Sequence, residues 1–164
     1  APCAKFIRLA REMDFDAVLL NVSFVGTDSL IHELSNEASE GVIITQVVPH
    51  FDADLPIIRD YRKAMRASFE RTNTDPRATW CPTFGSLEGY LAARILIRAI
   101  QTETQPITRV SILKALEALG AFDLGLGSAL YLSADEHQAS HRVWPTRLHE
   151  GRVVPFDWVE LAPR

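Results

Sequence analysis

Gly41-Val-Ile-Ile-Thr-Gln-Val-Val-Pro49 is the stretch that decides the fold. Its apolar run begins after a glycine and stops at a proline, a pattern typical of a short buried strand. A similar run, Ala17-Val-Leu-Leu-Asn-Val22, lies upstream, and residues 27–34 between the two have helical period. Strand, helix and strand with continuous apolar runs predict parallel pairing in a sheet that helices cover on both faces. The fold class is therefore α/β.

Helical periodicity surrounds these two strands. An N-terminal helix is predicted with one apolar face, made by Phe6, Leu9, Ala10 and Met13. Three helices in a row follow the second strand: one from Asp54, a largely enclosed one from Phe84 to about Gln101, and one that Thr108 caps and that places Gly120 at C′. The first of these has an apolar side and an opposite charged side. The apolar side is Ile57, Ile58, Tyr61, Ala64, Met65 and Phe69; the charged side is Arg59, Asp60, Arg62, Lys63 and Arg66.

The C-terminal part of the chain returns to strands. Ala129-Leu-Tyr-Leu132 is a short apolar run, and two further runs, 143–148 and 153–159, flank Glu150-Gly151. A Glu-Gly pair between two such runs favours a β-hairpin.

Composition and charge limit the function classes. A chain of 164 residues predicts about one domain with a real core. The formal charge of −4 is spread without long like-charge runs, which argues against a nucleic-acid partner. No apolar run approaches the ~20 residues of a membrane helix, and no secretory leader is visible from Ala1 onward. Cys3 and Cys81 are too few for a disulfide framework, so two unpaired thiols are favoured.

Motifs for nucleotide or hydrolase chemistry are missing from the sequence, and no cofactor is predicted. His137 and His141 stand four apart beside Asp135 and Glu136, and on a helix they would form one half of a zinc or nickel site. The segment is predicted as a loop leading to a strand, however, and no further ligands have a matching spacing. Surface histidines are therefore favoured over a metal site.

A ligand site is predicted where the first strand ends. Ser23, Phe24 and Thr27 follow that strand, and open α/β sheets bind ligands at the carboxyl ends of their strands. Helix capping by Thr27 or Asp28 is the competing interpretation.

Aromatic residues form a second candidate wall of this site. Trp80 and Phe84, with Tyr90 nearby, lie at a loop-to-helix junction, where aromatic side chains line small-ligand pockets. Packing in the core is the alternative for these residues.

Four motifs carry a resemblance to a known family. They are Ala10-Arg-Glu12, Ala38-Ser-Glu-Gly-Val42 leading to Pro49, Gly89-Tyr-Leu-Ala-Ala-Arg94 and Asp135-Glu-His-Gln-Ala139. In order and spacing they resemble the C-terminal half of type I periplasmic solute-binding proteins of ABC transporters, in the branched-chain amino acid branch. The resemblance runs from the first helix to the hairpin near Val154.

The resemblance implies a partial Venus flytrap fold, whose two lobes close over a small organic solute and deliver it to an inner-membrane ABC permease. It implies a periplasmic or extracellular location and no enzymatic activity. In amino acid binders of this family an acid in the loop after the first strand pairs with the ligand's ammonium group. Ser23 stands at that place here, which disfavours an α-amino acid and favours an amide, an aromatic acid or another organic solute.

The resemblance also implies that the chain is incomplete and begins in mid-protein at Ala1. Residues 1–48 would belong to the second lobe, the helices of 54–120 would pack on the first, and 125–164 would supply the return strands. Without their partners these helical faces would be covered by a second copy or a rearrangement, so a homo-oligomer is expected. A sensor domain with the same fold is the nearer alternative function. A metal-dependent α/β enzyme using His137 and His141 is the remoter one.

Overall fold

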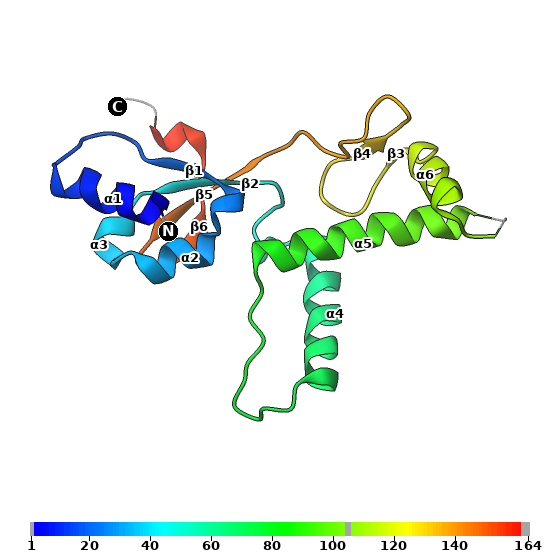
Figure 1. Cartoon of the computed structure of the whole chain (residues 1–164), viewed down its shortest axis with the longest axis horizontal. Helices are drawn as coiled ribbons and strands as arrows, with labels where there is room; N and C mark the ends of the chain where they lie inside the picture. Colours follow the sequence, from blue (N-terminus) through cyan, green and yellow to red (C-terminus); the bar gives the residue numbers. More distant parts are fainter. Residues whose placement is uncertain (1, 104–105, 162–164) are drawn as a thin grey trace. The chain divides into compact units, whose positions relative to one another are not determined.

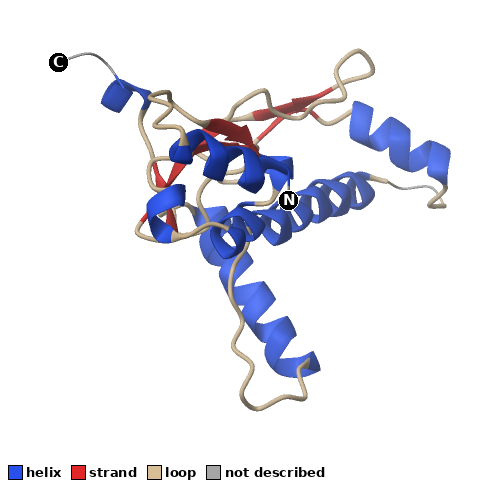
Figure 2. Ribbon diagram, turned by 60° about the vertical axis from the view of Figure 1, so that its left-hand side comes forward, coloured by secondary structure: helices blue, strands red, loops and turns tan. Residues whose placement is uncertain are grey.

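The structure is a computed structural model that describes residues 2–103 and 106–161, so Ala1 lies outside the described residues. The chain divides into two compact units. Unit 1 comprises Ala1–His50 and Val143–Arg164, and unit 2 comprises Phe51–Arg142. Unit 1 mixes strands and helices, whereas unit 2 is mostly helical (Figure 1, Figure 2).

Unit 1 is built on a four-stranded sheet of order β1-β2-β5-β6. The parallel pairing predicted for the first two strands is confirmed, with Leu20 opposite Ile43. β5 joins β2 antiparallel, and β6 completes the predicted hairpin through Glu150 and Gly151, which both have positive φ. The elements are α1 (Pro2–Glu12), β1 (Leu20–Val22), η1 (Ser23–Val25), α2 (Thr27–Glu33), α3 (Asn36–Ser39), β2 (Ile43–Gln46), β5 (Trp144–His149), β6 (Arg152–Pro155) and η2 (Trp158–Leu161).

Unit 2 contains the three predicted helices in a row: α4 (Pro56–Thr72), α5 (Phe84–Thr102) and α6 (Arg109–Glu117). α5 and α6 each begin with a capping box, in which Thr83 and Thr108 accept a hydrogen bond from the backbone three residues on. The predicted run at 129–132 forms β4 (Leu130–Leu132). Its antiparallel partner β3 (Gly120–Phe122) was not predicted, because three residues beside a glycine carry too little periodicity.

The core of unit 1 buries one face of α1 with Leu19, Ile44 and Leu148, and this face shares only Ala10 with the predicted one. Ala4, Ile7 and Ala10 are buried, whereas Phe6 is 61% and Met13 79% exposed. Leu9 is also exposed. Apolar residues occur on two faces of this helix, so the 3.6-residue period alone could not choose between them. Two of the three buried residues are alanines.

The helices of unit 2 are less enclosed than their sequences suggest. α4 buries Ile57, Ile58 and Tyr61, while its predicted inward residue Ala64 is exposed. α5 leaves Leu96 and Ile97 exposed, and α6 buries Ala115 while the larger Leu113 is exposed. Gly120 opens β3 with positive φ and lies two residues beyond the Ala118 C-cap, not at C′.

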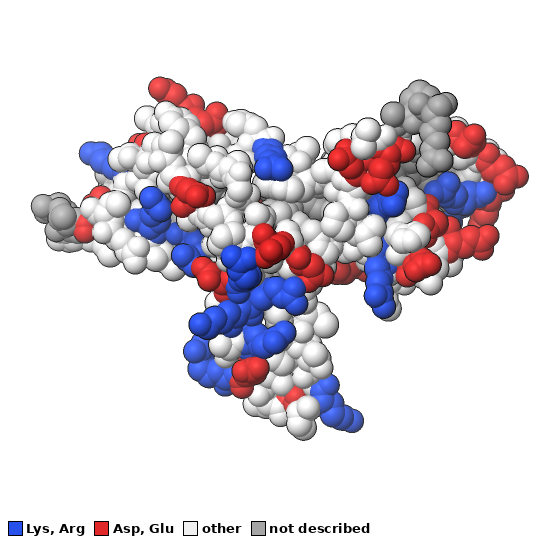
Figure 3. Space-filling view, turned by 180° about the vertical axis from the view of Figure 1, so that it is seen from behind, with Lys and Arg blue, Asp and Glu red and all other residues white. Residues whose placement is uncertain are grey.

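The charged side predicted for α4 is confirmed. Lys and Arg side chains gather over this helix (Figure 3), where Arg59, Lys63 and Arg66 are exposed. Arg59 pairs with Asp54, and Arg62 donates to Asp52. The charged face is therefore solvated and partly neutralised within its own unit.

A carboxylate fixes the turn of the β5–β6 hairpin to α3. Glu40, the C-cap residue of α3, contacts His149 Nδ1 at 2.6 Å through one oxygen and accepts the Glu150 N–H at 2.9 Å through the other. The hydrogen bond from His149 is the first cause of the lowered pKa of Glu40, and the same bond raises the pKa of His149. The lowered pKa of Glu40 makes the fold less stable as pH falls, whereas the raised pKa of His149 makes it less stable as pH rises.

We expect this contact to stabilise the fold most between about pH 4.5, the ordinary pKa of Glu40, and about pH 6.5, that of His149. Below this window the contribution is lost as pH falls through the lowered pKa of Glu40; above it, as pH rises through the raised pKa of His149. Urea unfolding across pH should show His149→Gln removing the loss on the alkaline side and Glu40→Gln removing both. His32→Gln, a change on α2, is the control. An unchanged pH profile in Glu40→Gln would contradict the assignment.

Candidate functional site

The carboxyl end of the parallel strand pair carries the first candidate group. Val22, the last residue of β1, lies opposite Thr45; Ser23 follows Val22, and Gln46 follows Thr45 as the last residue of β2. Ser23 is half-buried and opens the 3-10 turn η1, whereas Phe24 in that turn is 89% exposed. A polar loop with an exposed aromatic ring therefore stands where α/β sheets bind ligands.

Thr27 lies behind this turn and is buried, with 5% of its surface exposed. The N-cap of α2 is Gly26, with φ of +83° and no side-chain cap. Capping by Thr27 or Asp28 is therefore wrong as the explanation of these residues. The Thr27 hydroxyl oxygen instead accepts a hydrogen bond from Gln46 Nε2 at 2.9 Å.

Gln46 and Thr146 complete a buried polar triad with Thr27. Gln46 is fully buried, and its Nε2 also donates to Thr146 Oγ1 at 3.3 Å. Thr146 in turn donates to the carbonyl oxygen of Ile44 at 2.8 Å. Sequence reasoning missed both residues, although Gln46 gave a signal: at two-residue spacing it continues the core row of Val42 and Ile44, where an apolar side chain is expected.

Trp80 and Phe84 belong to unit 2, so they do not extend the loop within unit 1. Phe84 is buried, and its ring centroid lies 5.0 Å from that of Phe51. Trp80 is half-buried and meets the edge of the fully buried Tyr61 at 5.8 Å. Phe84 thus has the environment of a core residue, while Trp80 keeps one accessible side. Their sharing of a pocket with Ser23 and Phe24 stays a prediction.

Tyr61 organises the aromatic cluster of unit 2 and was assigned only to packing by its sequence pattern. Its hydroxyl lies 2.5 Å from Ser86 Oγ, and its ring also contacts that of Tyr90 at 5.6 Å. Arg94 donates to the Tyr90 hydroxyl at 2.8 Å and lies over the same ring. A row of hydroxyl and guanidinium groups therefore borders the aromatic cluster.

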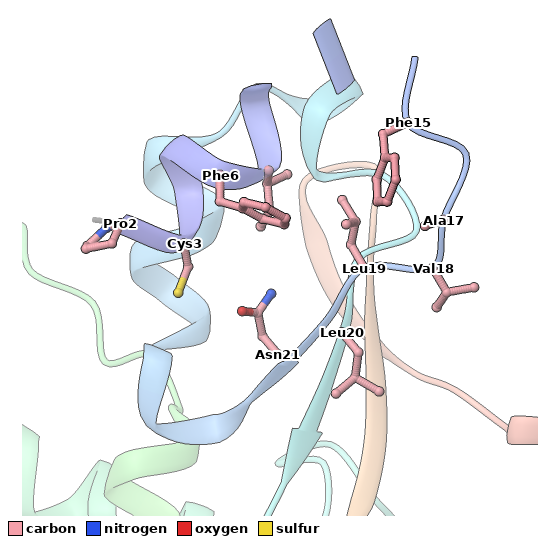
Figure 4. Close-up of a pocket in the computed structure, with 10 residues that line it drawn as sticks. Pro2, Cys3, Phe6, Phe15, Ala17, Val18, Leu19, Leu20 and Asn21 are labelled. Atoms are coloured by element: carbon pink, nitrogen blue, oxygen red, sulfur yellow. The ribbon is translucent and has the colours of Figure 1, made fainter. Parts of the chain in front are cut away.

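A groove of about 470 Å³ lies elsewhere in unit 1, between the start of α1 and the chain leading into β1. Cys3 and Phe6 face Leu19 and Asn21 across it (Figure 4). None of the five predicted ligand residues lines it. Apart from Asn21 and Cys3, its lining side chains are apolar: Pro2, Phe6, Ile7, Phe15, Ala17, Val18, Leu19 and Leu20.

The histidine motif lies in the predicted loop and does not gather ligands. His137 Nε2 lies 3.2 Å from Glu117, and His141 Nε2 lies 3.2 Å from Glu136. The backbone N–H of Gln138 and the His141 ring lower the pKa of Glu136. Within residues 2–103 and 106–161, no three His, Cys, Asp or Glu side chains come together as a metal site. The two imidazoles are thus held in separate surface pairs.

Two further sequence predictions concern the cysteines and membrane-spanning helices. Cys3 and Cys81 are both free thiols, as predicted. Among the described residues, no helix has the length and apolar character needed to cross a membrane.

An α/β sheet with a polar loop at its carboxyl edge, and aromatic residues on a second unit, is the architecture of a small-molecule-binding protein. A family described as periplasmic binding protein matches residues 1–152, and the chain belongs to that family. The family is one of solute-binding proteins of type I fold, so the predicted fold and family are confirmed.

Solved structures agree with this assignment. The chain is similar to a possible leucine/isoleucine/valine-binding protein from Rhodopirellula baltica, with 45% identity and a TM-score of 0.86 over 99% of this chain and 42% of that one. A substrate-binding periplasmic protein from Ralstonia solanacearum is 25% identical (TM-score 0.75; 94% and 42%). A fatty acid ABC transporter substrate-binding protein from Thermomonospora curvata, 21% identical, shares the fold (TM-score 0.72; 94% and 39%). No curated protein matches the chain. The chain thus spans less than half the length of these solved structures.

Burial predicts different consequences for two of the candidate ligand residues. Phe84→Ala should lower the free energy of unfolding by about 3 kcal/mol or more, because it empties a packed site. Phe24→Ala should change it by less than about 0.5 kcal/mol, because that ring is exposed. Urea unfolding of both variants measures the difference. An equally large loss for Phe24→Ala would show that this ring is buried in solution and is not available to a ligand.

Proposed function

We propose that this chain is part of a periplasmic binding protein that captures a small organic solute and delivers it to an ABC permease in the inner membrane. The family match over residues 1–152 carries the proposal. The polar loop at the carboxyl edge of β1 and β2 supports it, because this edge offers a few fixed polar groups beside an exposed ring. Ser23, Phe24 and Thr27 are the proposed contribution of unit 1, and Trp80 and Phe84 that of unit 2.

The solute proposed here is a neutral amide or an aromatic acid. Ser23 offers a hydroxyl where the resemblance places an acid in amino acid binders, and Thr27 and Gln46 are also uncharged. Neutral groups give an ammonium ion no charge-assisted contact. The exposed Phe24 ring adds an apolar surface against which a planar or branched solute can pack. Location in the periplasm and the absence of catalytic activity follow from the same proposal.

Solute selectivity tests this proposal in the full-length gene product. Isothermal titration with isovaleramide, phenylacetate and leucine should give tighter binding of the first two than of leucine. Ser23→Asp should reverse the order by adding a carboxylate for the ammonium group of leucine, with about a tenfold gain in leucine affinity. Ser29→Asp places the same charge within α2 and is the matched control. Binding of none of the three solutes by the wild type would overturn the proposed function.

Three parts of the chain are proposed to belong to different lobes of the complete protein. Residues 1–48 are assigned to the second lobe, the helices of 54–120 to packing on the first, and 125–164 to the return strands. Exposed apolar side chains in both units support this assignment, among them Val18 and Leu20 beside the groove and Ile97 on α5. The outer edge of β1 also lacks a neighbouring strand among the described residues.

We expect residues 1–164 in isolation to self-associate through these apolar surfaces. Leu20 is 50% exposed on the edge strand β1, and β1 has no charged residue to block pairing with another chain. Multi-angle light scattering should show concentration-dependent association that Leu20→Lys weakens. Val159→Lys, at an exposed apolar position of η2, is the matched control. A monodisperse monomer at high concentration without dye-accessible apolar surface would contradict this expectation.

A further inference from the structure

Gln46 occupies a position where its sheet calls for an apolar side chain. Val42 and Ile44, at two-residue spacing before it, are fully buried in the core of unit 1, and Thr146 lies directly opposite Ile44 on β5. At the carboxyl end of β2 the core row therefore becomes polar. Burying an amide has a free-energy cost unless each of its polar atoms has a partner.

Only one end of the Gln46 amide has partners. Nε2 donates to the hydroxyl oxygens of Thr27 and Thr146, but the buried Oε1 accepts no hydrogen bond from any described residue. The orientation of the amide is fixed by its surroundings. Because the Thr146 hydroxyl donates its proton to Ile44, the atom facing Thr146 has to be a donor. The buried atom without a hydrogen-bond partner is thus Oε1, an acceptor.

This acceptor lies at the candidate ligand edge. Gln46 is the last residue of β2, Ser23 follows the last residue of the paired strand β1, and Thr27, which contacts Gln46, begins the helix after η1. η1 is a single 3-10 turn without a side-chain cap, closed by the Gly26 N–H donating to Ser23 O at 3.1 Å. The Phe24 side chain on this turn is 89% exposed, so its burial contributes little to holding η1 in place.

We infer that Gln46 is a specificity-determining residue, whose Oε1 accepts a hydrogen bond from an N–H group of the solute once η1 moves aside. The inference rests on the proposed function and narrows it to solutes that carry a neutral N–H donor, such as a primary amide. Thr27 and Thr146 act as positioning residues: their hydroxyl oxygens hold Nε2 and leave Oε1 as the unused acceptor. An internal water molecule on Oε1 is the alternative donor, and it would give Gln46 a structural role alone.

Matched probes separate these two donors. Phenylacetamide and methyl phenylacetate have the same apolar body, but only the amide carries an N–H donor. In the full-length gene product, isothermal titration should show about tenfold tighter binding of the amide, because a buried acceptor left unpaired disfavours the ester. Gln46→Met keeps the side-chain length, removes the acceptor and should abolish this preference. Thr45→Val, the neighbouring residue of β2 on the opposite face, is the control and should keep it.

Gln46→Leu also removes the acceptor, suits the apolar row of Val42 and Ile44, and should likewise abolish the preference for the amide. It decides the question where Gln46→Met does not fold, which thermal unfolding of each variant shows. An equal loss of affinity for both probes in Gln46→Met or Gln46→Leu, which leaves the preference for the amide unchanged, would overturn the inference and leave the proposed function standing. Binding of neither probe nor any solute of the earlier panel by the wild type would overturn both.

Discussion

The position of β2 at the centre of the unit 1 sheet is the constraint on which the rest of that unit depends. It pairs with β1 on one side and β5 on the other, and Val42, Ile43, Ile44 and Gln46 expose almost no surface. Pairing with β5 joins the two ends of the chain in one unit, across about a hundred residues of sequence. A one-residue change of register in β2 would turn every side chain of the strand to the opposite face and separate Gln46 from Thr27. The candidate site therefore exists because this strand is held on both sides.

Much of the fold could be predicted because its elements are long or have residues that mark where they begin and end. The capping threonine of α6, the glycine before β2 and the Glu-Gly turn of the hairpin each mark a boundary in the sequence itself. The errors arose where the sequence offers two equivalent choices. α1 has apolar residues on two faces, and only tertiary packing selects Ile7 over Phe6. β3 is too short to have a period at all.

The candidate site was predictable only in part, for a related reason. Ser23, Phe24 and Thr27 could be named because they follow a recognisable strand, and the structure places them together with β2. Gln46 was hidden within the run that identifies that strand, where a single polar residue does not disturb the apolar pattern. Thr146 pairs across the sheet with a residue far away in sequence, and no local signal announces such a pairing. A polar residue among the core-facing residues of a strand can therefore be recognised as a candidate site residue only once the strand register is known.

The two candidate surfaces of unit 1 differ in the chemistry they can provide. The groove beside α1 is lined mainly by apolar side chains, and of these lining residues only Asn21 and Cys3 carry a polar side-chain atom. Ligand sites need a small number of placed polar groups to orient what they bind. The carboxyl edge of β1 and β2 has such groups in Ser23, Thr27 and Gln46, with one acceptor still unused. Apolar area without fixed donors and acceptors serves packing, as between domains or chains. The groove is therefore better suited to burial against other polypeptide, and the strand ends to recognition of a solute.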